Sequence, residues 1–558
     1  MFNIIGVLCF VIVVIKINIT LKYLKMTEIN NKNFEQHFPE IRKALEQAKF
    51  VSVDLEFSAL YPLKEYSPSL FDTPNERYQK IRKNVKLVVP IQVGLTAFSF
   101  NPDTNSYLGT IYNFYIIPAS FPFIRKNCLF QSDTLSFLKF FEFDFNKFVY
   151  SGIPYMNKDE EQEIRQRFKS NDITDVQSLF RQELETIFHN EGEKIRNWYM
   201  TANIGETITI PEFYQVSKDS DEFVYFIHKT IRERFKGVWS SVENDEFVLK
   251  KVTIEESIKL NQVCNLEEEC IKNLLGFSRV FRYLVSLQKP LVGHNLMQDL
   301  LLMLECFEKP LPSSYESFKK TINALFPKIF DTKTILYNIK KQVPEDKTIN
   351  DKSLKDTFEY FKDGVGRHLA LNSPAIENNC NGTYKYHEAG WDSFCAGYIF
   401  IRMAYFNLYQ KYPKSKRYMS GELIAGLEFC QNKVNVIRGA VSSIQLDGED
   451  PASTRPPYLV VESLKNAPIN IHQVSSVLSS FGFVEIRKFP YQNKMALIAV
   501  DNFGSARRIL QNFKSNKEYQ IRQYSALKHS PVIRACLLSG VTISGVILLW
   551  ITHSIIKK

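Results

Sequence analysis

The chain has 558 residues, a formal net charge of +10, 45% hydrophobic residues and 23% charged residues. These values are typical of globular proteins, so they exclude a largely disordered chain and a protein with many membrane spans, and the length predicts three or four domains of about 100–200 residues. The nine cysteines show neither zinc-site spacing nor a disulfide framework, which favours a reducing compartment, and the small positive charge names no partner.

Residues 1–25 form an apolar N-terminal extension. Its apolar run, 2–15, is followed by lysines and lacks the basic start and the small-residue cleavage site of a secretory signal. The run is also shorter than the stretch of about 20 residues that a membrane span needs. We expect an interfacial segment or an extension before a functional start at Met26, with an anchor as the third alternative.

Residues 26–159 are predicted to form the first half of an α/β core. Apolar residues recur at helical intervals over 33–49, which predicts an amphipathic helix. Three runs rich in β-branched and aromatic residues follow at 50–57, 86–98 and 109–118, separated by turn-rich stretches, as in a meander of strands.

The second half of this core is predicted at 261–417. Residues 277–307 alternate between helix, strand and helix, which indicates an α/β layer architecture with a mixed sheet. Between the halves, residues 160–260 are charged and mostly helical in pattern, and we expect an inserted small α/β module there.

The C-terminal part is predicted to hold a linker, a small domain and an anchor. Residues 418–457 are expected to connect, with a turn-rich stretch at 446–458. Residues 458–527 alternate as β-α-β-β-α-β, the order of the ferredoxin-like unit of RNA-recognition domains, although the central strand MALIAVD lacks their stacking aromatics. The uncharged run 535–552 is long enough to nearly cross a bilayer, which predicts a tail-anchor transmembrane helix.

The string FVSVDLEF places two carboxylates, Asp54 and Glu56, in an apolar strand. Side chains two residues apart on a strand face the same way, so these carboxylates project together and repel each other. A divalent cation between them is the usual solution, and Mg²⁺ prefers oxygen ligands of this kind. Two solvated charges on an exposed strand are the alternative, but uncompensated carboxylates in a central strand are costly.

Two further acidic residues have equally particular settings. Asp299 lies in LVGHNLMQDLLLM, one turn into a helix that follows a buried strand, where we expect Asn295 to be the N-cap. Asp392 lies in YHEAGWDSFCAGYIF, near the start of an apolar helix. His387 precedes it by five residues, a rotation of about 140° on a helix, so we expect the histidine in the preceding loop. A zinc protease is disfavoured because HEAGW lacks the second histidine of H-E-x-x-H.

D-x-E, G-H-N-x-x-x-D and H-x-A-G-x-D, in this order, resemble the motifs of a two-metal 3′-to-5′ exonuclease with an RNase H-like sheet, of the DEDDh type. FVSVDLEFSAL, FDFNKFVYSGIPYMNKDEE, VGHNLMQD, IFDTK and HEAGWD together resemble the poly(A)-specific ribonuclease (PARN) family. The apolar C-terminus points to its PARN-like domain-containing branch, which includes enzymes that trim piRNA precursors. The resemblance covers residues 33–525.

The resemblance implies a role for each matching residue. Asp54, Glu56, Asp299 and Asp392 match metal-binding carboxylates for two Mg²⁺ ions, with Mn²⁺ as the alternative, and His387 matches the general base. Three other positions match substrate-binding residues, namely Phe57, Asn295 and Lys333, although a core, capping or solvated role is the alternative for each. Asp331 in IFDTK is expected to order a loop rather than to bind metal.

The function expected from this resemblance is exonucleolytic removal of nucleoside 5′-monophosphates from single-stranded RNA. The most specific form is trimming of piRNA precursors held by a PIWI protein, with a Tudor-type scaffold, on the mitochondrial outer membrane, the endoplasmic reticulum being the alternative membrane. A general poly(A) deadenylase and a catalytically silent, membrane-tethered RNA-binding adaptor are the other hypotheses. The inserted module resembles the small nucleic-acid-binding insertion of the family by position and by its ending, a tryptophan followed by FVLKKV. It lacks an R-x-x-x-H signature, so RNA contact there is not expected, and neither is cap recognition.

Overall fold

The computed structural model describes residues 27–525 and 528, except 125, 171–177, 219, 381–384, 413–416, 466 and 490–491. The described residues divide into two compact units, the first within 1–67, 78–435 and 445–449, the second within 68–77, 436–444 and 450–558. The N-terminal extension and the expected tail anchor lie outside the described residues. Among the helices that are described, none is long and apolar enough to cross a membrane.

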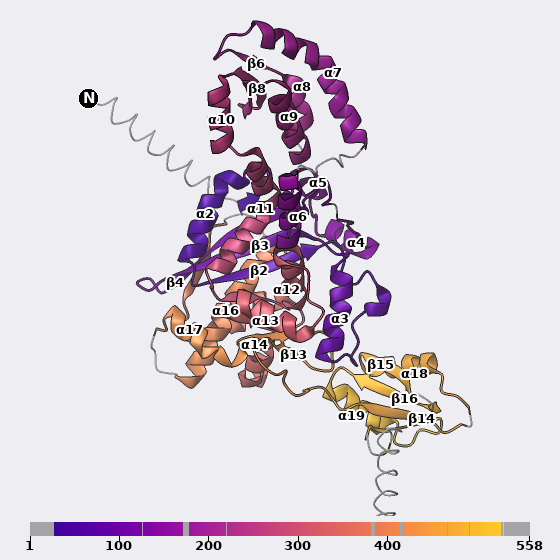
Figure 1. The fold of residues 1–558 in the computed structure, drawn as a ribbon. Helices are drawn as coiled ribbons and strands as arrows, with labels where there is room; N and C mark the ends of the chain where they lie inside the picture. The colour runs from indigo at the N-terminus through magenta and orange to yellow at the C-terminus, as the bar shows by residue number, and fades with distance from the viewer. Residues whose placement is uncertain are drawn as a thin grey trace, which may run out of the picture. The chain divides into compact units, whose positions relative to one another are not determined.

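The first unit is built on a mixed sheet (Figure 1). Its main order is β1-β4-β3-β2-β9-β10, in which β2, β3 and β4 are antiparallel neighbours and β9 is parallel to β2. The α/β class with a mixed sheet is thereby confirmed. The strands are β1 Thr27–Ile29, β2 Phe50–Phe57, β3 Pro90–Asn101, β4 Ser106–Pro118, β5 Ile153–Tyr155, β9 Leu291–Gly293, β10 Ile329–Asp331 and β11 Ala375–Asn378, with β5 and β11 beside β4.

Helix α16 (Ala389–Lys411) packs on β2, β3 and β4, and nearly all of its residues are buried. Phe50 of β2 stacks on Phe98 of β3 with ring centres 4.7 Å apart, and it meets Phe400 of α16 edge-on at 5.0 Å. Because alternate side chains of a strand face the same way, Asp54 and Glu56 also project toward the α16 side of β2. The apolar contacts at the start of β2 therefore orient the carboxylates near its end.

The remaining helices of the core surround this sheet. Helix α11 bends at Gly276, whose φ of +32° suits glycine, and a Cβ there would lie 2.2 Å from the carbonyl oxygen of Pro154. The helices are α2 Phe34–Gln47, α3 Pro74–Val85, α4 Ser132–Phe140, α5 Phe145–Ser151, α6 Lys158–Ser170, α11 Leu266–Ser286, α12 Met297–Met303, α13 Tyr315–Leu325, α14 Thr332–Ile339, α15 Leu354–Lys362 and α17 Ser420–Gly426.

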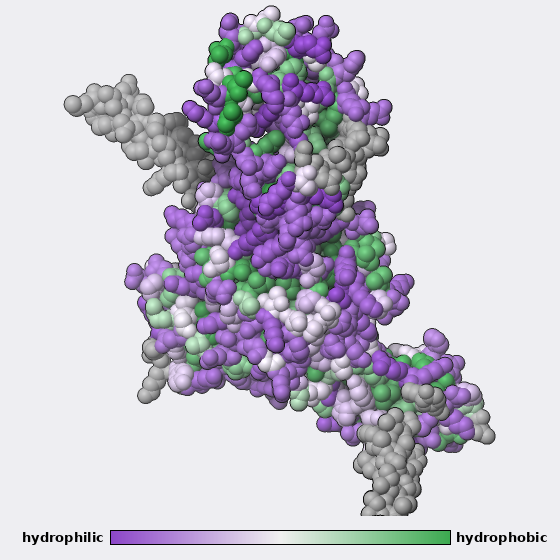
Figure 2. Space-filling model, viewed as in Figure 1, coloured by the Kyte–Doolittle hydropathy of each residue, from purple (hydrophilic) through white to green (hydrophobic). Residues whose placement is uncertain are grey.

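The inserted segment forms a helical module with a small antiparallel sheet and an apolar core of its own, which includes Phe213, Ile227 and Phe247. Figure 2 shows a hydrophobic patch over α10, where Ile254 and Ile258 are exposed. The elements are α7 Ser178–Thr201, β6 Thr207–Thr209, α8 Pro211–Ser217, α9 Asp221–Arg234, β7 Val238–Glu243, β8 Glu246–Lys251 and α10 Ile254–Val263.

The segment expected to be a linker, 418–457, is more structured than its sequence suggests. It contains α17 and a two-stranded sheet of β12 (Lys433–Asn435) and β13 (Ser443–Gln445). Asn432 fastens it to the core, because its backbone N–H donates to the Ile329 carbonyl and its side chain accepts from the Ile329 N–H. These contacts are long-range, so the turn-rich composition did not reveal them.

The second unit contains a four-stranded antiparallel sheet of order β15-β16-β14-β17. Two helices cover one face of the sheet through a core that includes Val461, Ile498 and Ile509. The elements run β14 Leu459–Ser463, α18 Ile471–Leu478, β15 Val484–Phe489, β16 Gln492–Val500, α19 Phe503–Asn512 and β17 Tyr519–Gln523, which is the order of a ferredoxin-like unit.

Candidate active site

The centre of the candidate site is the end of β2. Asp54 pairs with Gly94 of β3, and Glu56 pairs with Gln92, after which the register shifts at Phe57. Both carboxylate side chains are half-buried. The third carboxylate comes from α12, where Asp299 Oδ1 accepts a hydrogen bond from the backbone N–H of Leu55 at 3.2 Å. This bond places Asp299 directly beside the strand that carries the first two.

The fourth carboxylate, Asp392, is placed by the start of α16. The first turn of a helix has backbone N–H groups without helical partners. Here the N–H of Ala389 donates to Oε1 of Gln92 at 2.9 Å, and the N–H of Gly390 donates to Oδ1 of Asn113 at 3.0 Å. Two buried polar side chains of β3 and β4 therefore hold the helix start against the sheet.

Gly94 makes this close packing possible. A Cβ at this position would lie 1.8 Å from the carbonyl oxygen of Ala389 and 2.4 Å from the nitrogen of Gly390. These are backbone atoms at the helix start, which cannot give way as a flexible side chain would. Since Gly94 is the partner of Asp54 in the sheet, the glycine brings α16 close to the strand acids.

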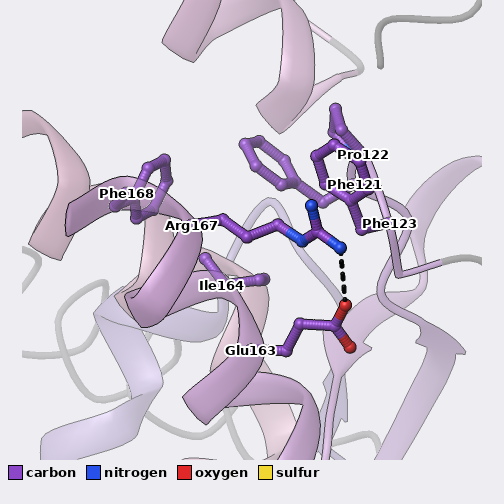
Figure 3. Close-up of a pocket in the computed structure, with 7 residues that line it drawn as sticks. All are labelled: Phe121, Pro122, Phe123, Glu163, Ile164, Arg167 and Phe168. Atoms are coloured by element: carbon purple, nitrogen blue, oxygen red, sulfur yellow. Dashed lines mark hydrogen bonds and ion pairs between the residues drawn. The ribbon is translucent and has the colours of Figure 1, made fainter. Parts of the chain in front are cut away.

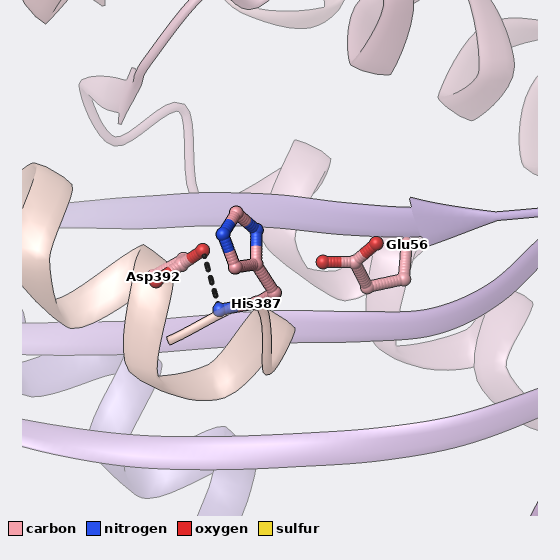
Figure 4. Close-up of side chains that lie close together, drawn as sticks. All are labelled: Glu56, His387 and Asp392. Carbon is pink, nitrogen blue, oxygen red and sulfur yellow. Dashed lines mark hydrogen bonds between the residues drawn. The ribbon is translucent and has the colours of Figure 1, made fainter. Parts of the chain in front are cut away.

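His387 lies in the loop before α16, as expected from the sequence. Its backbone has a φ of +63°, and its N–H donates to Oδ2 of Asp392 at 3.2 Å (Figure 4). Nitrogen or oxygen atoms of Glu56, His387 and Asp392 all lie within 4.8 Å of one another. Left-handed backbone at a non-glycine residue is uncommon and is concentrated at functional sites.

An aromatic wall, formed by Phe137, Phe140 and Phe141, adjoins the histidine. The imidazole of His387 lies 4.0 Å from the ring centre of Phe141 and 4.9 Å from that of Phe137. Phe140 is 79% exposed and Phe137 is 42% exposed, and Figure 2 shows hydrophobic side chains gathered over α4. This wall was not predicted from the sequence, in which the run FLKFF is its only local signal.

The surroundings of the four carboxylates raise the pKa of each one in the absence of a cation. Burial, then the charges of neighbouring acids, raises the pKa of Asp54 and of Glu56 well above the ordinary range. Burial raises the pKa of Asp299 and of Asp392 to about 7, although backbone hydrogen bonds oppose the shift. Crowded buried acids of this kind gain stability when a positive charge is placed among them.

The donor set fits a hard divalent cation. Carboxylate oxygens are the ligands that Mg²⁺ and Mn²⁺ prefer, and four of them converge here. In addition, Oδ1 of Asp392 is buried and has no hydrogen-bond partner in the described part of the chain, and leaving such an oxygen unpaired is unfavourable. A bound cation would satisfy it.

In metal-free buffer we expect the free energy of unfolding to fall as the pH rises from about 4 to about 7. The folded protein retains protons on Asp299 and Asp392 up to about pH 7, whereas the unfolded chain releases them near 3.8. In this window the unfolded state binds fewer protons than the folded state, so raising the pH lowers the free energy of unfolding, by about a few kcal/mol in total. Denaturant titrations with EDTA, repeated across this range, measure the slope.

Mg²⁺ should reverse this loss, because it binds the ionised carboxylates of the folded state. The increase in melting temperature on adding Mg²⁺ should be larger at pH 8 than at pH 5. Asp103→Asn, which removes an exposed carboxylate in the β3–β4 turn, should leave both effects unchanged. The assignment of the site would be contradicted if the free energy of unfolding rose with pH over this window, or if Mg²⁺ left the melting temperature unchanged.

The residues expected to bind substrate have different surroundings. Phe57 is half-buried at the bulge after Glu56. Asn295 is not the N-cap that we expected, because α12 begins after Leu296 and Asn295 adopts a left-handed φ of +61°, where its side chain accepts from Asn435 at 2.7 Å. Lys333 is buried at the start of α14, and its ammonium donates to the carbonyl oxygen of Asp351.

Asp331 orders the loops around the site. This fully buried carboxylate accepts hydrogen bonds from four backbone N–H groups at 2.9–3.1 Å. The donors belong to three separate segments, and they are Asn295, Leu296, Lys333 and Asn435. With its oxygens so engaged, Asp331 is a structural acceptor.

A pocket between the loop after β4 and helix α6 lies apart from the acids (Figure 3). The guanidinium of Arg167 projects between its aromatic rings, 3.6 Å from the ring centre of Phe123, and pairs with Glu163 at 3.3 Å. The arginine therefore fills the space that a flat ligand would occupy. We assign no ligand to this pocket.

Comparisons with known proteins show the family of the chain. The model of the CAF1 family ribonuclease matches residues 29–400. The pre-piRNA 3′-exonuclease trimmer of Bombyx mori is 34% identical over 542 residues, covering 95% of this chain and 99% of that protein. The poly(A)-specific ribonuclease PNLDC1 of Mus musculus is 28% identical, and the match covers 92% of this chain and 96% of that protein. The poly(A)-specific ribonuclease PARN of Danio rerio is 26% identical, and the match covers 89% of this chain and 77% of that protein. The Mg²⁺- and Mn²⁺-bound structure of S. pombe Pop2p aligns with 15% identity and a TM-score of 0.32, covering 70% of this chain and 94% of that one.

Proposed function

The chain belongs to the CAF1 family of ribonucleases, in its PARN-like branch, and is a 3′-to-5′ exoribonuclease; we propose that it uses Mg²⁺ to trim the 3′ ends of piRNA precursors. One observation carries the catalytic part of this proposal: Glu56, His387 and Asp392 come together within 4.8 Å, beside Asp54 and Asp299. The name of the Bombyx mori relative supports the substrate.

We assign Asp54, Glu56, Asp299 and Asp392 as the residues that hold two divalent ions. The bound ions would supply the positive charge that makes a water molecule acidic and that stabilises the departing 3′-oxygen. The carboxylates themselves orient these charges between β2, α12 and α16. Hydrolysis at the terminal phosphodiester would then release nucleoside 5′-monophosphates one at a time.

His387 is assigned as the general base. Burial, and then the charge of Lys355, holds the pKa of His387 below its usual range, so its imidazole is neutral and can accept a proton near pH 7. The contacts with Phe141 and with Phe137 fix the plane of the ring. Its backbone bond to Asp392 links the position of the base to that of a metal ligand.

The aromatic wall supports a single-stranded substrate. Exposed rings bind successive bases by stacking, an interaction that every base can make. Phe137 presents such a ring next to His387, and Phe140 presents another next to Phe141. A strand whose last bases stack there would place its 3′ end near the acids without selecting one base, which favours trimming over selective removal of adenosine.

We propose further that the enzyme acts on precursors carried by a PIWI-clade protein, with a Tudor-type scaffold, and that residues 535–552 anchor it in the mitochondrial outer membrane with the nuclease on the cytosolic side. The uncharged run in the sequence supports the anchor. The endoplasmic reticulum membrane remains the alternative location.

The substrate proposal is tested with two 5′-labelled RNAs that differ only in the 3′ tail, one of adenosines and one of mixed sequence. We expect shortening rates that agree within about threefold, because stacking tolerates every base. A catalytically inactive protein with Glu56→Gln serves as the control. Shortening of the adenosine tail alone would identify a deadenylase, and shortening of neither tail, even with a PIWI protein present, would identify a silent adaptor.

A further inference from the structure

The four-stranded sheet of the second unit has two faces, and only one of them is covered by its helices. Leu459, Val461 and Ile498 point toward α18 and α19 in the domain core. Side chains at alternate positions point to the opposite face, and these include Leu497 and Ala499 of β16. In RNA-recognition domains this opposite face stacks bases on its two central strands.

Here that face is already occupied. Leu70 and Phe71, from the segment 68–77 that runs into α3, form an apolar cluster with Ala499, against which Tyr458 and Leu497 pack. Leu70 is 3% exposed and Phe71 is 8% exposed. The central part of the face is therefore buried under the chain's own backbone and side chains.

The contacts of Phe71 are those that would bind a planar base. Its ring centre lies 5.3 Å from that of Tyr458, and the guanidinium carbon of Arg487 lies 4.5 Å above it. Aromatic and guanidinium groups are the usual partners of a base on a sheet, although the rings of Phe71 and Tyr458 are tilted by 36° rather than stacked. In this protein a phenylalanine takes that place.

Polar contacts fix the same segment in one register. Oε2 of Glu485 accepts from the hydroxyl of Ser69 at 2.5 Å and from the N–H of Leu70 at 2.9 Å. Arg77 donates to the carboxylate of Asp72 at 3.1 Å and to the carbonyl oxygen of Ser69 at 3.0 Å, and both charged side chains are 2% exposed. This ion pair lies within the segment, and Arg77 also donates to the carbonyl oxygens of Ile437 and Arg438, so it fixes the conformation of the segment, while Glu485 fixes the segment on the sheet.

We propose that this face is a peptide-binding socket for Ser69–Leu70–Phe71 of the same chain, and that it does not bind RNA. The socket recognises a hydroxyl and an N–H through Glu485, and an aromatic ring through Tyr458 and Arg487. The domain thus fastens a segment that follows the active-site strand. The intervening residues 58–67 are held separately, by hydrogen bonds from Leu60 and Tyr61 to Gln131 and from Leu63 to Asn84.

The test compares Arg487→Ala with Lys488→Ala in the full-length chain. Both variants remove one positive charge from β15, so any purely electrostatic loss of RNA affinity should be equal. Arg487→Ala should increase the rate of proteolysis within 68–77 at least about tenfold, as expected when a local anchor is lost, and Lys488→Ala should not. The affinity of the two variants for a single-stranded 30-mer, measured by fluorescence anisotropy, should agree within about threefold.

Phe71→Ala and the conservative Phe71→Leu complete the test. Phe71→Ala should accelerate the same cleavage without strengthening RNA binding, and Phe71→Leu should restore most of the protection. Trimming rates below the unfolding temperature should remain close to those of the parent protein, which separates this proposal from the assignment of the nuclease. The proposal would be overturned if Phe71→Ala bound RNA tenfold more tightly, or if Arg487→Ala lost RNA affinity that Lys488→Ala retained. It would also be overturned if neither Phe71→Ala nor Arg487→Ala changed the rate of proteolysis.

Discussion

Asp54→Asn is expected to abolish exonuclease activity, with a decrease of about 10³-fold or more in the rate of 3′-end shortening. Asparagine keeps the shape of the side chain but removes a negative charge from the group that would hold the cations. Asp54 has the charges of Asp392, Asp299 and Glu56 around it, so it belongs to the centre of this group. Single-turnover assays with a 5′-labelled RNA measure the effect.

The same variant should be more stable than the parent protein without metal. Removing one of four crowded acids relieves the mutual repulsion of the group, which grows above about pH 7, where Asp299 and Asp392 ionise. The increase in melting temperature with Mg²⁺ should largely disappear. Asp103→Asn, at an exposed turn, is the matched control and should change none of the three measurements. Full activity of the Asp54→Asn protein would show that the four carboxylates do not act in catalysis.

Gly94→Val is expected to be the most damaging substitution in the sheet. Even a Cβ would overlap the backbone of Ala389 and Gly390, so α16 would have to move away from β3. Overpacking of this kind costs about 1–3 kcal/mol and occasionally more. A displaced helix start also moves Asp392 and His387, and a shift of about 1 Å in catalytic groups can lower the rate roughly 10²-fold.

Thermal unfolding and activity, both measured for the same preparation, separate the two consequences. Activity should be lost even well below the lowered melting temperature. Gly192→Ala is the matched control, because a Cβ at this position of α7 meets nothing within 4 Å. It should be neutral or stabilising by roughly 0.5–1 kcal/mol, as for glycine in a helix. Normal activity in Gly94→Val would show that the close approach of α16 is unnecessary.

The parts of the site that follow local rules could be predicted from the sequence. Strand alternation was enough to place Asp54 and Glu56 on one side of β2. The rotation per residue of a helix was enough to place His387 in the loop before the helix that carries Asp392. The order of strands and helices likewise indicated a mixed α/β sheet. The exonuclease class came from the motifs taken together, and the family comparison bears it out.

The features that the sequence did not reveal depend on contacts between distant segments. Gly94 looks like an unremarkable strand residue until α16, about 300 positions later, is seen against it. The aromatic wall is likewise defined by a histidine 246 positions beyond Phe141. Phe71 lies in a turn-rich stretch, and only the folded second unit shows that its ring is buried.

One local expectation, that Asn295 caps α12, was wrong. Asn295 adopts a left-handed backbone instead of capping α12, because Asp331 binds the adjacent N–H groups and Asn435 binds its side chain. Asn435 itself belongs to β12, within the segment expected to be a linker. A buried carboxylate that organises three segments thus overrode the preferences of each.

The exonuclease assignment is tested by analysing the products that the full-length protein with Mg²⁺ releases from a 5′-labelled, 3′-extended RNA. We expect a ladder that shortens from the 3′ end by single nucleotides, release of nucleoside 5′-monophosphates, and disappearance of both with EDTA or with Asp54→Asn. Internal cleavage, release of nucleoside 3′-monophosphates, or a ladder that persists in the Asp54→Asn protein would contradict this assignment.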